Sequence, residues 1–87
     1  MDRVLLASGS DKGIELLSQL LKISGYGQII GTKSGNDARR CINQNEYELI
    51  VINTPLSDEF GHELSIKAAE SSNSGIILIC KSDTVSY

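Results

Sequence analysis

Residues 48–61 read ELIVINTPLSDEFG, and this stretch decides the predicted fold. Its apolar run reaches Ile52, stops at the amide side chain of Asn53, and continues into a polar segment that ends at Gly61. A short apolar run bounded by turn residues is typical of a strand that is buried on both faces, as in a parallel sheet. The pattern therefore predicts a buried strand with a polar side chain at its tip.

Three further apolar runs resemble this strand, and helical patterns separate them. The four strands are expected at residues 3–8, 28–34, 48–53 and from Gly75 to Lys81, and the helical patterns lie within residues 9–27, 35–47 and 61–74. Strands that alternate with helices indicate right-handed βαβ units. The predicted fold class is α/β: a three-layer, doubly wound parallel sheet of four strands with three helices.

The first helix has the clearest signals. Ser10 or Asp11 suits its N-cap, and Gly25 suits the left-handed position after its last turn, with Tyr26 folding back behind it. Apolar residues recur at helical spacing on one face. That stripe consists of Ile14, Leu17 and Leu21 and is widened by Leu16 and Leu20.

The other two helices are shorter. Asn36 is the expected N-cap of the second, whose apolar face carries Ala38, Cys41 and Ile42. The third helix places Leu64 and Ala68 on one face, which directs Ile66 away from the sheet and leaves it available for contact with a partner.

Size and charge restrict the class of protein. The sequence has 87 residues, which allows one domain over residues 1–87, and its net charge of −3 argues against direct binding to a phosphate backbone. No apolar run approaches the roughly 20 residues that a membrane-spanning helix needs, and the N-terminus does not resemble a signal peptide. Cys41, Cys80 and the single His62 do not form a zinc set, so we expect free thiols in a reducing cytoplasm.

The last predicted strand raises a question of pairing. The run from Gly75 to Lys81 is strongly apolar, and no helical pattern follows it in residues 82–87. An apolar strand at an open sheet edge is prone to aggregate unless another segment pairs with it. We therefore expect the domain to be incomplete, with this edge completed in a homodimer or by a missing C-terminal output region.

Residues 47–64, YELIVINTPLSDEFGHEL, resemble the third strand and following loop of a response-regulator receiver domain. That family has a Tyr-Asp-Leu opening, a buried run, a phosphoacceptor aspartate, a Leu-Pro-Asp loop, and a glycine eight residues after the acceptor. Here Tyr-Glu-Leu opens the run, Leu-Ser-Asp stands in the loop, and Gly61 lies eight residues after Asn53. Gly-Asn-Asp-Ala at residues 35–38 is similar to the opening of the family's second helix, and the resemblance extends from Arg3 to Lys81. It implies the strand order 2-1-3-4 and a domain that lacks the family's fifth βα unit.

The resemblance also assigns the positions of the family's phosphoryl chemistry. The phosphoacceptor position holds Asn53, the paired acidic positions hold Ser8 and Gly9, and the Thr/Ser switch position holds Cys80; the fifth strand and its lysine are missing. An amide cannot form an acyl phosphate, and Mg²⁺ binds through carboxylates and waters. We therefore expect neither conventional phosphorylation nor Mg²⁺ binding, no other cofactor, and no enzymatic activity.

Together these features imply a pseudo-receiver that signals through protein contacts, homodimerisation above all. The chain looks most like the N-terminal receivers of antiterminator-type (ANTAR) regulators, in two-component signal transduction or phosphorelays. In that family RNA is bound by an output module, which residues 1–87 lack, so RNA contact is expected only through such a module.

Other interpretations of single residues stay open. Asn53 is also compatible with a polar residue that caps its loop, Cys80 with a small buried filler, and His62 with a partly buried structural role. Asp58 is expected to face solvent rather than to act as a substitute acceptor. A flavodoxin-like domain that binds a small ligand or an anion, with Ser10 in the Ser8-Gly9-Ser10 loop at a helix N-terminus, is the alternative function.

Overall fold

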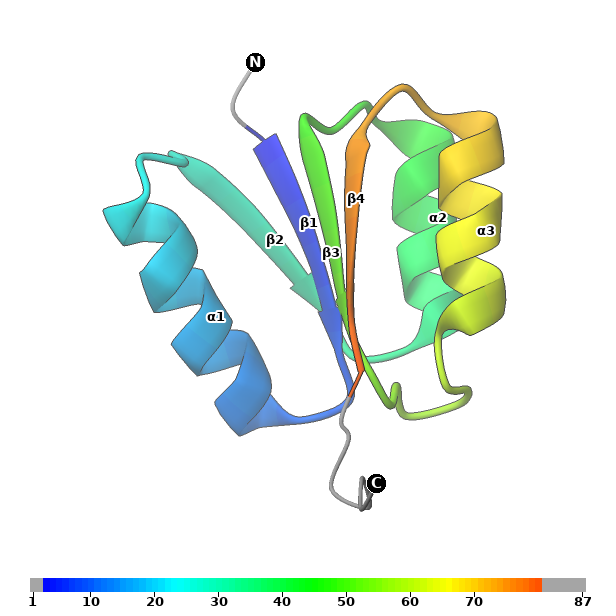
Figure 1. Cartoon of the computed structure of the whole chain (residues 1–87), viewed down its shortest axis with the longest axis horizontal. Helices are drawn as coiled ribbons and strands as arrows, with labels where there is room; N and C mark the ends of the chain where they lie inside the picture. Colours follow the sequence, from blue (N-terminus) through cyan, green and yellow to red (C-terminus); the bar gives the residue numbers. More distant parts are fainter. Residues whose placement is uncertain (1–2, 81–87) are drawn as a thin grey trace, which may run out of the picture.

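The computed structural model describes residues 3–80 and contains one four-stranded parallel sheet (Figure 1). The strands run in the order β2-β1-β3-β4, so the predicted fold class and strand order are confirmed. Along the chain the elements are β1 (Arg3–Ser8), α1 (Asp11–Ile23), β2 (Gln28–Thr32), α2 (Gly35–Gln44), β3 (Leu49–Asn53), α3 (His62–Ser71) and β4 (Gly75–Ile79).

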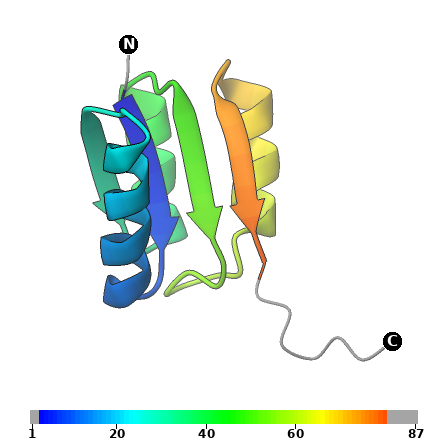
Figure 2. The same cartoon turned by 60° about the vertical axis from the view of Figure 1, so that its left-hand side comes forward.

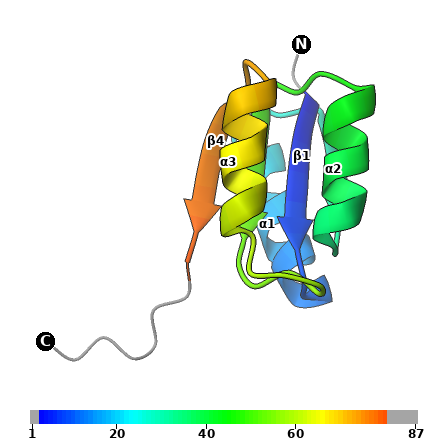
Figure 3. The same cartoon turned by 90° about the vertical axis from the view of Figure 1, so that its right-hand side faces the viewer.

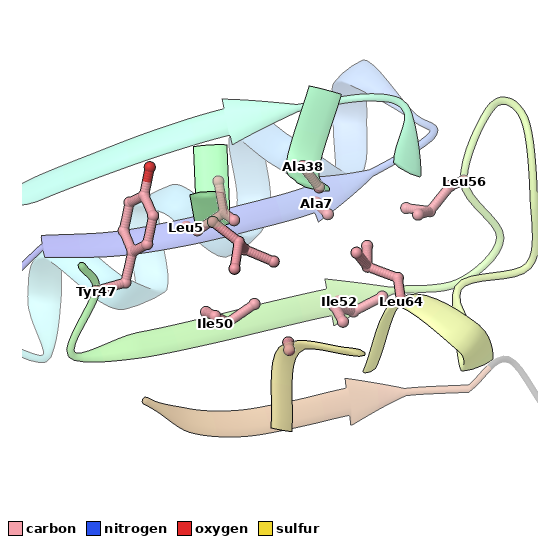
Figure 4. Close-up of a cluster of buried hydrophobic side chains, with 10 residues drawn as sticks. Leu5, Ala7, Ala38, Tyr47, Ile50, Ile52, Leu56 and Leu64 are labelled. Carbon is pink, nitrogen blue, oxygen red and sulfur yellow. The ribbon is translucent and has the colours of Figure 1, made fainter. Parts of the chain in front are cut away.

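Helices α2 and α3 lie together on one face of the sheet, and α1 lies on the other (Figures 1 and 3). The larger core fills the space between the sheet and the α2–α3 pair (Figure 4). Leu64 and Ala68 of α3 and Ala38 of α2 are fully buried there, as their spacing predicted. The cluster consists of Leu5, Ala7, Ala38, Ile42, Tyr47, Ile50, Ile52, Leu56, Leu64 and Ala68.

The core on the α1 side is smaller, and it corrects one prediction. Only Val4, Leu6 and Val51 are buried in it, and α1 itself has no buried residue. Ile14, Leu17 and Leu21 pack against this cluster as expected. Leu16 and Leu20, which were expected to widen the buried stripe, are exposed. The reason is that α1 packs on β1 and β2, and no helix among residues 3–80 lies beside its other flank.

Both ends of α1 are formed as predicted. The Ser10 hydroxyl accepts the Gly13 N–H at 3.2 Å, which makes Ser10 the N-cap. At the other end Gly25 adopts φ of 103°, and the Tyr26 N–H donates to the Leu21 carbonyl at 3.1 Å. A glycine in the left-handed region with this backbone hydrogen bond is a Schellman cap, which satisfies carbonyls that the helix leaves free.

Several element boundaries differ from the predictions. The N-cap of α2 is Ser34 and not Asn36, because the Ser34 hydroxyl accepts the Asp37 N–H at 3.1 Å. Strands β2, β3 and β4 are shorter than the predicted runs: β2 ends at Thr32, β3 begins at Leu49, and β4 ends at Ile79. Cys80 follows β4 outside the sheet and is exposed, so it is not a buried filler, and Lys81 lies outside the described residues.

The first turn of α3 also departs from the sequence interpretation. His62 is the first residue of the helix and is exposed, so the expected partial burial is wrong. Gly61 before it has φ of 113°, and a Cβ there would approach the Ile52 side chain to 2.9 Å. Only glycine fits this sharp entry into α3. Across residues 3–80, no helix has the length and apolar character that a membrane crossing requires.

Candidate functional site

The tips of β1 and β3 bring together the two strand-end side chains that the resemblance singled out. Ser8 and Asn53 are register partners in the sheet, and the Asn53 Nδ2 donates to the Ser8 Oγ at 3.1 Å. Ser8 is almost completely buried, whereas Asn53 is half-buried. An amide and a hydroxyl therefore stand hydrogen-bonded where two neighbouring strands end.

A pocket of about 450 Å³ opens beside this pair. It lies at the carboxyl ends of the strands, which is where parallel α/β sheets bind ligands. Every one of its lining residues is uncharged at neutral pH, and none carries a carboxylate. They are Ser8, Gly9, Ser10, Gly13, Asn53, Thr54, Pro55, Leu56 and Ile79.

Gly9 is held against the loop that follows β3. Its N–H donates to the Pro55 carbonyl at 3.2 Å. A Cβ added at Gly9 would lie 2.8 Å from that oxygen and 2.9 Å from the Leu56 carbonyl carbon. Both are backbone atoms, so a side chain at position 9 requires the loop to move. The loop fills the space that a second acidic side chain would need.

Ser10 and the N-terminus of α1 form the floor of the same pocket. The Ser10 hydroxyl is already engaged as the N-cap, and Asp11 in the first turn forms an ion pair with Lys33 at 2.6 Å. A Cβ at Gly13 would lie 2.6 Å from the Ser8 Oγ and 2.9 Å from the Asn53 Nδ2. Gly13 thus allows the first turn of α1 to approach the Ser8–Asn53 pair closely.

Asp58 lies away from the pocket and caps a different helix. Its carboxylate accepts the Gly35 N–H at 2.7 Å and the Asn36 N–H at 3.3 Å, at the start of α2. The Gly35 hydrogen bond is the main cause that lowers the pKa of this carboxyl below its ordinary value. An anion at a helix N-terminus is also favoured by the helix dipole. The side chain faces solvent, as expected, but it is held in place by α2.

An ion pair also attaches the loop between β3 and α3, which contains Asp58, to helix α2. Arg39 of α2 binds both carboxylate oxygens of Glu59, and one of the two contacts, from Nη2 to Oε1, measures 3.1 Å. The side-chain hydrogen bond to Glu59 raises the pKa of Arg39. Sequence patterns do not reveal this pair, since 20 residues separate the partners and no local pattern connects them.

Cys80 lies close to the pocket but does not line it. Its Sγ is 3.8 Å from the Nε2 of His62, at the start of α3. The neighbouring Ile79 carbonyl accepts both the N–H and the hydroxyl of Thr54, each at 2.9 Å. The structure therefore brings Ser8, Gly9, Ser10 and Asn53 together and directs the Cys80 thiol towards α3.

No protein-family model matches the chain, and no curated protein matches it significantly. Solved structures do match. The MaeR response regulator bound to beryllium trifluoride has a TM-score of 0.81 at 17% identity, over 95% of this chain and 70% of that one. The response regulator TrrA from Thermotoga maritima, in complex with Mg²⁺-BeF, has a TM-score of 0.72 at 17% identity, over 97% of this chain and 90% of that one.

A third match is the adenylate cyclase from Rhodopirellula baltica, with a TM-score of 0.75 at 23% identity. The alignment covers 88% of this chain and 57% of the adenylate cyclase chain. Because the sequence identities are only 17–23%, these similarities establish a shared fold and no shared function. Residues 3–80 adopt a fold like that of these response regulators, with four parallel strands in the order 2-1-3-4 and three helices.

Proposed function

We propose that the chain is a receiver-like signalling module of a two-component or antitermination regulator that is not phosphorylated and acts through protein contacts. It works in the cytoplasm without a metal cofactor and catalyses no reaction. One observation carries this proposal: the hydrogen bond between the Asn53 amide and the Ser8 hydroxyl at the strand tips.

The chemistry of this pair argues against phosphoryl transfer. A carboxamide is not a carboxylate nucleophile, so Asn53 has no route to an acyl phosphate. Mg²⁺ retains most of its waters and needs one or two carboxylates, whereas the residues that line the pocket carry none. The nearby Asp58 carboxylate is committed to the N-terminus of α2.

The surroundings of the pair support the same conclusion. The loop after β3 lies against Gly9, where a second acidic side chain would stand. The position of the family's switch hydroxyl holds the Cys80 thiol, which contacts His62. A thiol is a weaker hydrogen-bond donor than a hydroxyl, so it is poorly suited to follow a phosphoryl group.

The output of such a module follows from the sequence resemblance. Receivers of the ANTAR type precede a helical module that binds RNA, and the acidic balance of this chain suits a regulatory part rather than an RNA-binding part. We therefore assign any RNA contact to an output region and none to the described residues.

The test is a titration of ¹⁵N-labelled chain with Mg²⁺ and beryllofluoride, followed by incubation with acetyl phosphate. We expect no saturable shift of the Ser8, Gly9 and Asn53 amides and no gain of a phosphoryl group in the intact mass. The Asn53→Asp variant is the matched comparison, and it too is expected to stay unphosphorylated because Ser8 and Gly9 supply no charge for Mg²⁺. Saturable shifts or a phosphorylated product in the wild type would show that the site is functional.

The anion-binding alternative is favoured by the small side chains around the N-terminus of α1. Two features count against it: the Ser10 hydroxyl already accepts the Gly13 N–H, and the negative charge of Asp11 in the first turn repels an anion. Thermal unfolding in the presence of sulfate or a flavin nucleotide would distinguish the anion-binding function from the signalling function. A saturable rise in Tm with either would favour the alternative.

A further inference from the structure

A second pocket lies at the opposite end of the sheet from the Ser8–Asn53 pair. It has a volume of about 480 Å³ and opens where β3 and β4 begin, between the ends of α2 and α3. The loops from α2 to β3 and from α3 to β4 frame it, at the end of the sheet away from the arrowheads (Figures 2 and 3). We call it the amino-end pocket; it is lined by Ile42, Asn45, Glu46, Tyr47, Glu48, Glu70, Ser71, Ser72, Asn73 and Ser74.

Hydrogen bonds hold the two framing loops together. The Ser74 hydroxyl donates to the Tyr47 carbonyl, and the Gly75 N–H donates to the Glu48 carbonyl at 3.0 Å. The Ser72 hydroxyl accepts the Ser74 N–H at 3.4 Å. The walls of the pocket are therefore formed before any ligand binds.

The lining of the pocket is negatively charged. It includes three glutamates and no lysine, arginine or histidine. Three acids in the described part of the chain form ion pairs, and all three lie outside this pocket, whereas Glu46, Glu48 and Glu70 form none. Arg3 reaches the rim, where its Nη1 donates to the Asn45 Oδ1 at 3.2 Å, but it forms no ion pair with these glutamates. Within residues 3–80, the three carboxylates are left without a cation.

The helix ends that meet at the pocket add to this negative charge. Helices α2 and α3 both have their C-termini here, where a helix carries partial negative charge and a lysine or arginine is favourable. Neither helix has a basic residue in its last turn, and α3 has Glu70 there. Helix α1, by contrast, has Lys22 in its last turn. A charge arrangement that is unfavourable for the free chain is expected where a ligand compensates it.

The buried part of the lining is apolar. Tyr47 and Ile42 are only 6% and 8% exposed, whereas all three glutamates are exposed. A lysine or arginine side chain has an aliphatic stem that packs on apolar surface and a charged head that stays near water. An apolar wall with a carboxylate rim is complementary to such a side chain.

An arginine matches these acceptors better than a metal ion or a lysine does. In residues 3–80, no group of three or more His, Cys, Asp and Glu side chains could hold a metal ion. The acceptors are instead spread over two loops and include carboxylates, hydroxyls and the carbonyls of two helix ends. A guanidinium presents five N–H donors in one plane and is more weakly hydrated than an ammonium, so it can reach several of these acceptors at once.

We propose that the amino-end pocket binds an arginine side chain from a basic segment of a partner protein, with the aliphatic stem on the apolar wall and the guanidinium among the three glutamates. Phosphate-bearing partners are disfavoured because the pocket is negatively charged. This inference deepens the proposed function and rests on it, because it names the surface and the partner chemistry of a module that acts through protein contacts. Exposed ion pairs each contribute little, so we expect a transient contact with a Kd of about 10 µM to 1 mM.

The test is a titration of the ¹⁵N-labelled 87-residue chain with a blocked Gly-Arg-Gly-Arg-Gly peptide. The same peptide with citrulline in place of arginine is the uncharged control. We expect saturable shifts of the amides of residues 45–48 and 71–74 with the arginine peptide, and at least tenfold weaker binding of the citrulline peptide. The amides of Ser8 and Asn53, at the other end of the sheet, should not shift.

The variant is Glu48→Gln combined with Glu70→Gln, and the matched control is Glu15→Gln on α1. Glu15 is also exposed and forms no ion pair among residues 3–80, so its replacement removes a similar charge away from the pocket. We expect the double variant to weaken peptide binding at least tenfold and Glu15→Gln to change it less than twofold. Glu70→Gln alone should not lower Tm, because it removes a negative charge from a helix C-terminus, so weaker binding would not reflect unfolding.

The absence of saturable shifts over this range, equal binding of the two peptides, or equal effects of the double variant and Glu15→Gln would overturn the proposal. Equal shifts with Mg²⁺ alone would mean that the surface attracts any cation, which also overturns it. The phosphoryl titration is read at Ser8, Gly9 and Asn53 instead. An amino-end pocket that does not respond therefore contradicts this inference alone, whereas a phosphoryl response contradicts the proposed function.

Discussion

Asn53 and Gly9 differ in whether the structure can accept an acidic side chain at their positions. Asn53 could become an aspartate with little change in shape, since the two side chains are nearly isosteric. Gly9 has no such freedom, because the backbone of residues 55 and 56 lies within 3 Å of any added Cβ. The path of the loop therefore excludes a side chain at position 9, and the chemistry that the site allows depends on more than the residue at the strand tip.

Gly9→Ala tests the closeness of that loop. We expect a loss of about 1–3 kcal/mol in the free energy of unfolding, since overpacking forces backbone shifts. Gly75→Ala is the control, because a Cβ there meets the Leu49 side chain at 3.5 Å and the Glu48 carbonyl oxygen at 3.8 Å, both ordinary contacts, and it should change stability by less than about 0.5 kcal/mol. Urea denaturation of both variants measures this, and similar losses would show that the loop moves freely.

Asp58 should make stability depend on pH. Its pKa is lowered chiefly by the Gly35 N–H, so the folded state binds a proton less readily than the unfolded chain. The contribution is fully present above the ordinary aspartate pKa of about 3.9 and is lost as the pH falls through the lowered value.

Replacing Asp58 with asparagine removes this dependence. Urea unfolding from neutral to acidic pH should show Asp58→Asn less stable than the wild type at neutral pH, with the difference closing in acid. Ser57→Ala, an exposed neutral neighbour, should differ from the wild type by a constant amount. A gap between Asp58→Asn and the wild type that does not narrow in acid would contradict the capping role.

At the scale of elements, substitutions at the start of α2 distinguish the observed N-cap, Ser34, from the predicted one, Asn36. Ser34→Ala should destabilise the protein by about 1 kcal/mol, because it removes the acceptor of the Asp37 N–H. Asn36→Ala should have little effect, since Asn36 takes part in the cap through its backbone N–H, which Asp58 accepts. Thermal or urea unfolding of the two variants decides this, and a larger loss for Asn36→Ala would restore the sequence-based assignment.

The α2 cap also illustrates what the sequence could predict. Apolar runs and helical spacing predicted all seven elements and the burial of Leu64 and Ala68, because these depend on local patterns. The strand order was predicted from the family resemblance, since local patterns do not determine it. The capping of α2 by Asp58 joins residues 23 positions apart, which local patterns cannot show. Leu16 and Leu20 were misjudged for the same reason, since their exposure depends on which strands α1 covers. At the site, the family resemblance singled out Ser8 and Asn53, but only the three-dimensional structure shows that the loop after β3 packs against Gly9.

For the whole molecule, the unequal faces imply unequal local stability. Among residues 3–80, the α2–α3 side contains ten buried core residues and the α1 side three, and α1 contributes none of them. Elements with few buried apolar contacts open without global unfolding. We expect α1 to open independently, while β1 and β3 exchange their amide protons only when the whole domain unfolds.

Native-state hydrogen exchange on dilute, monomeric chain measures this difference. Protection of the α1 amides should be at least tenfold lower than that of β1 and β3, which corresponds to about 1.4 kcal/mol. Helix α2 provides the internal control, because it is shorter than α1 but has three buried residues, so helix length alone predicts the opposite order. If α1 were as protected as β1 in the monomer, packing over two strands would suffice to hold it. Lower protection in α1 means that its stability depends on what covers its exposed flank.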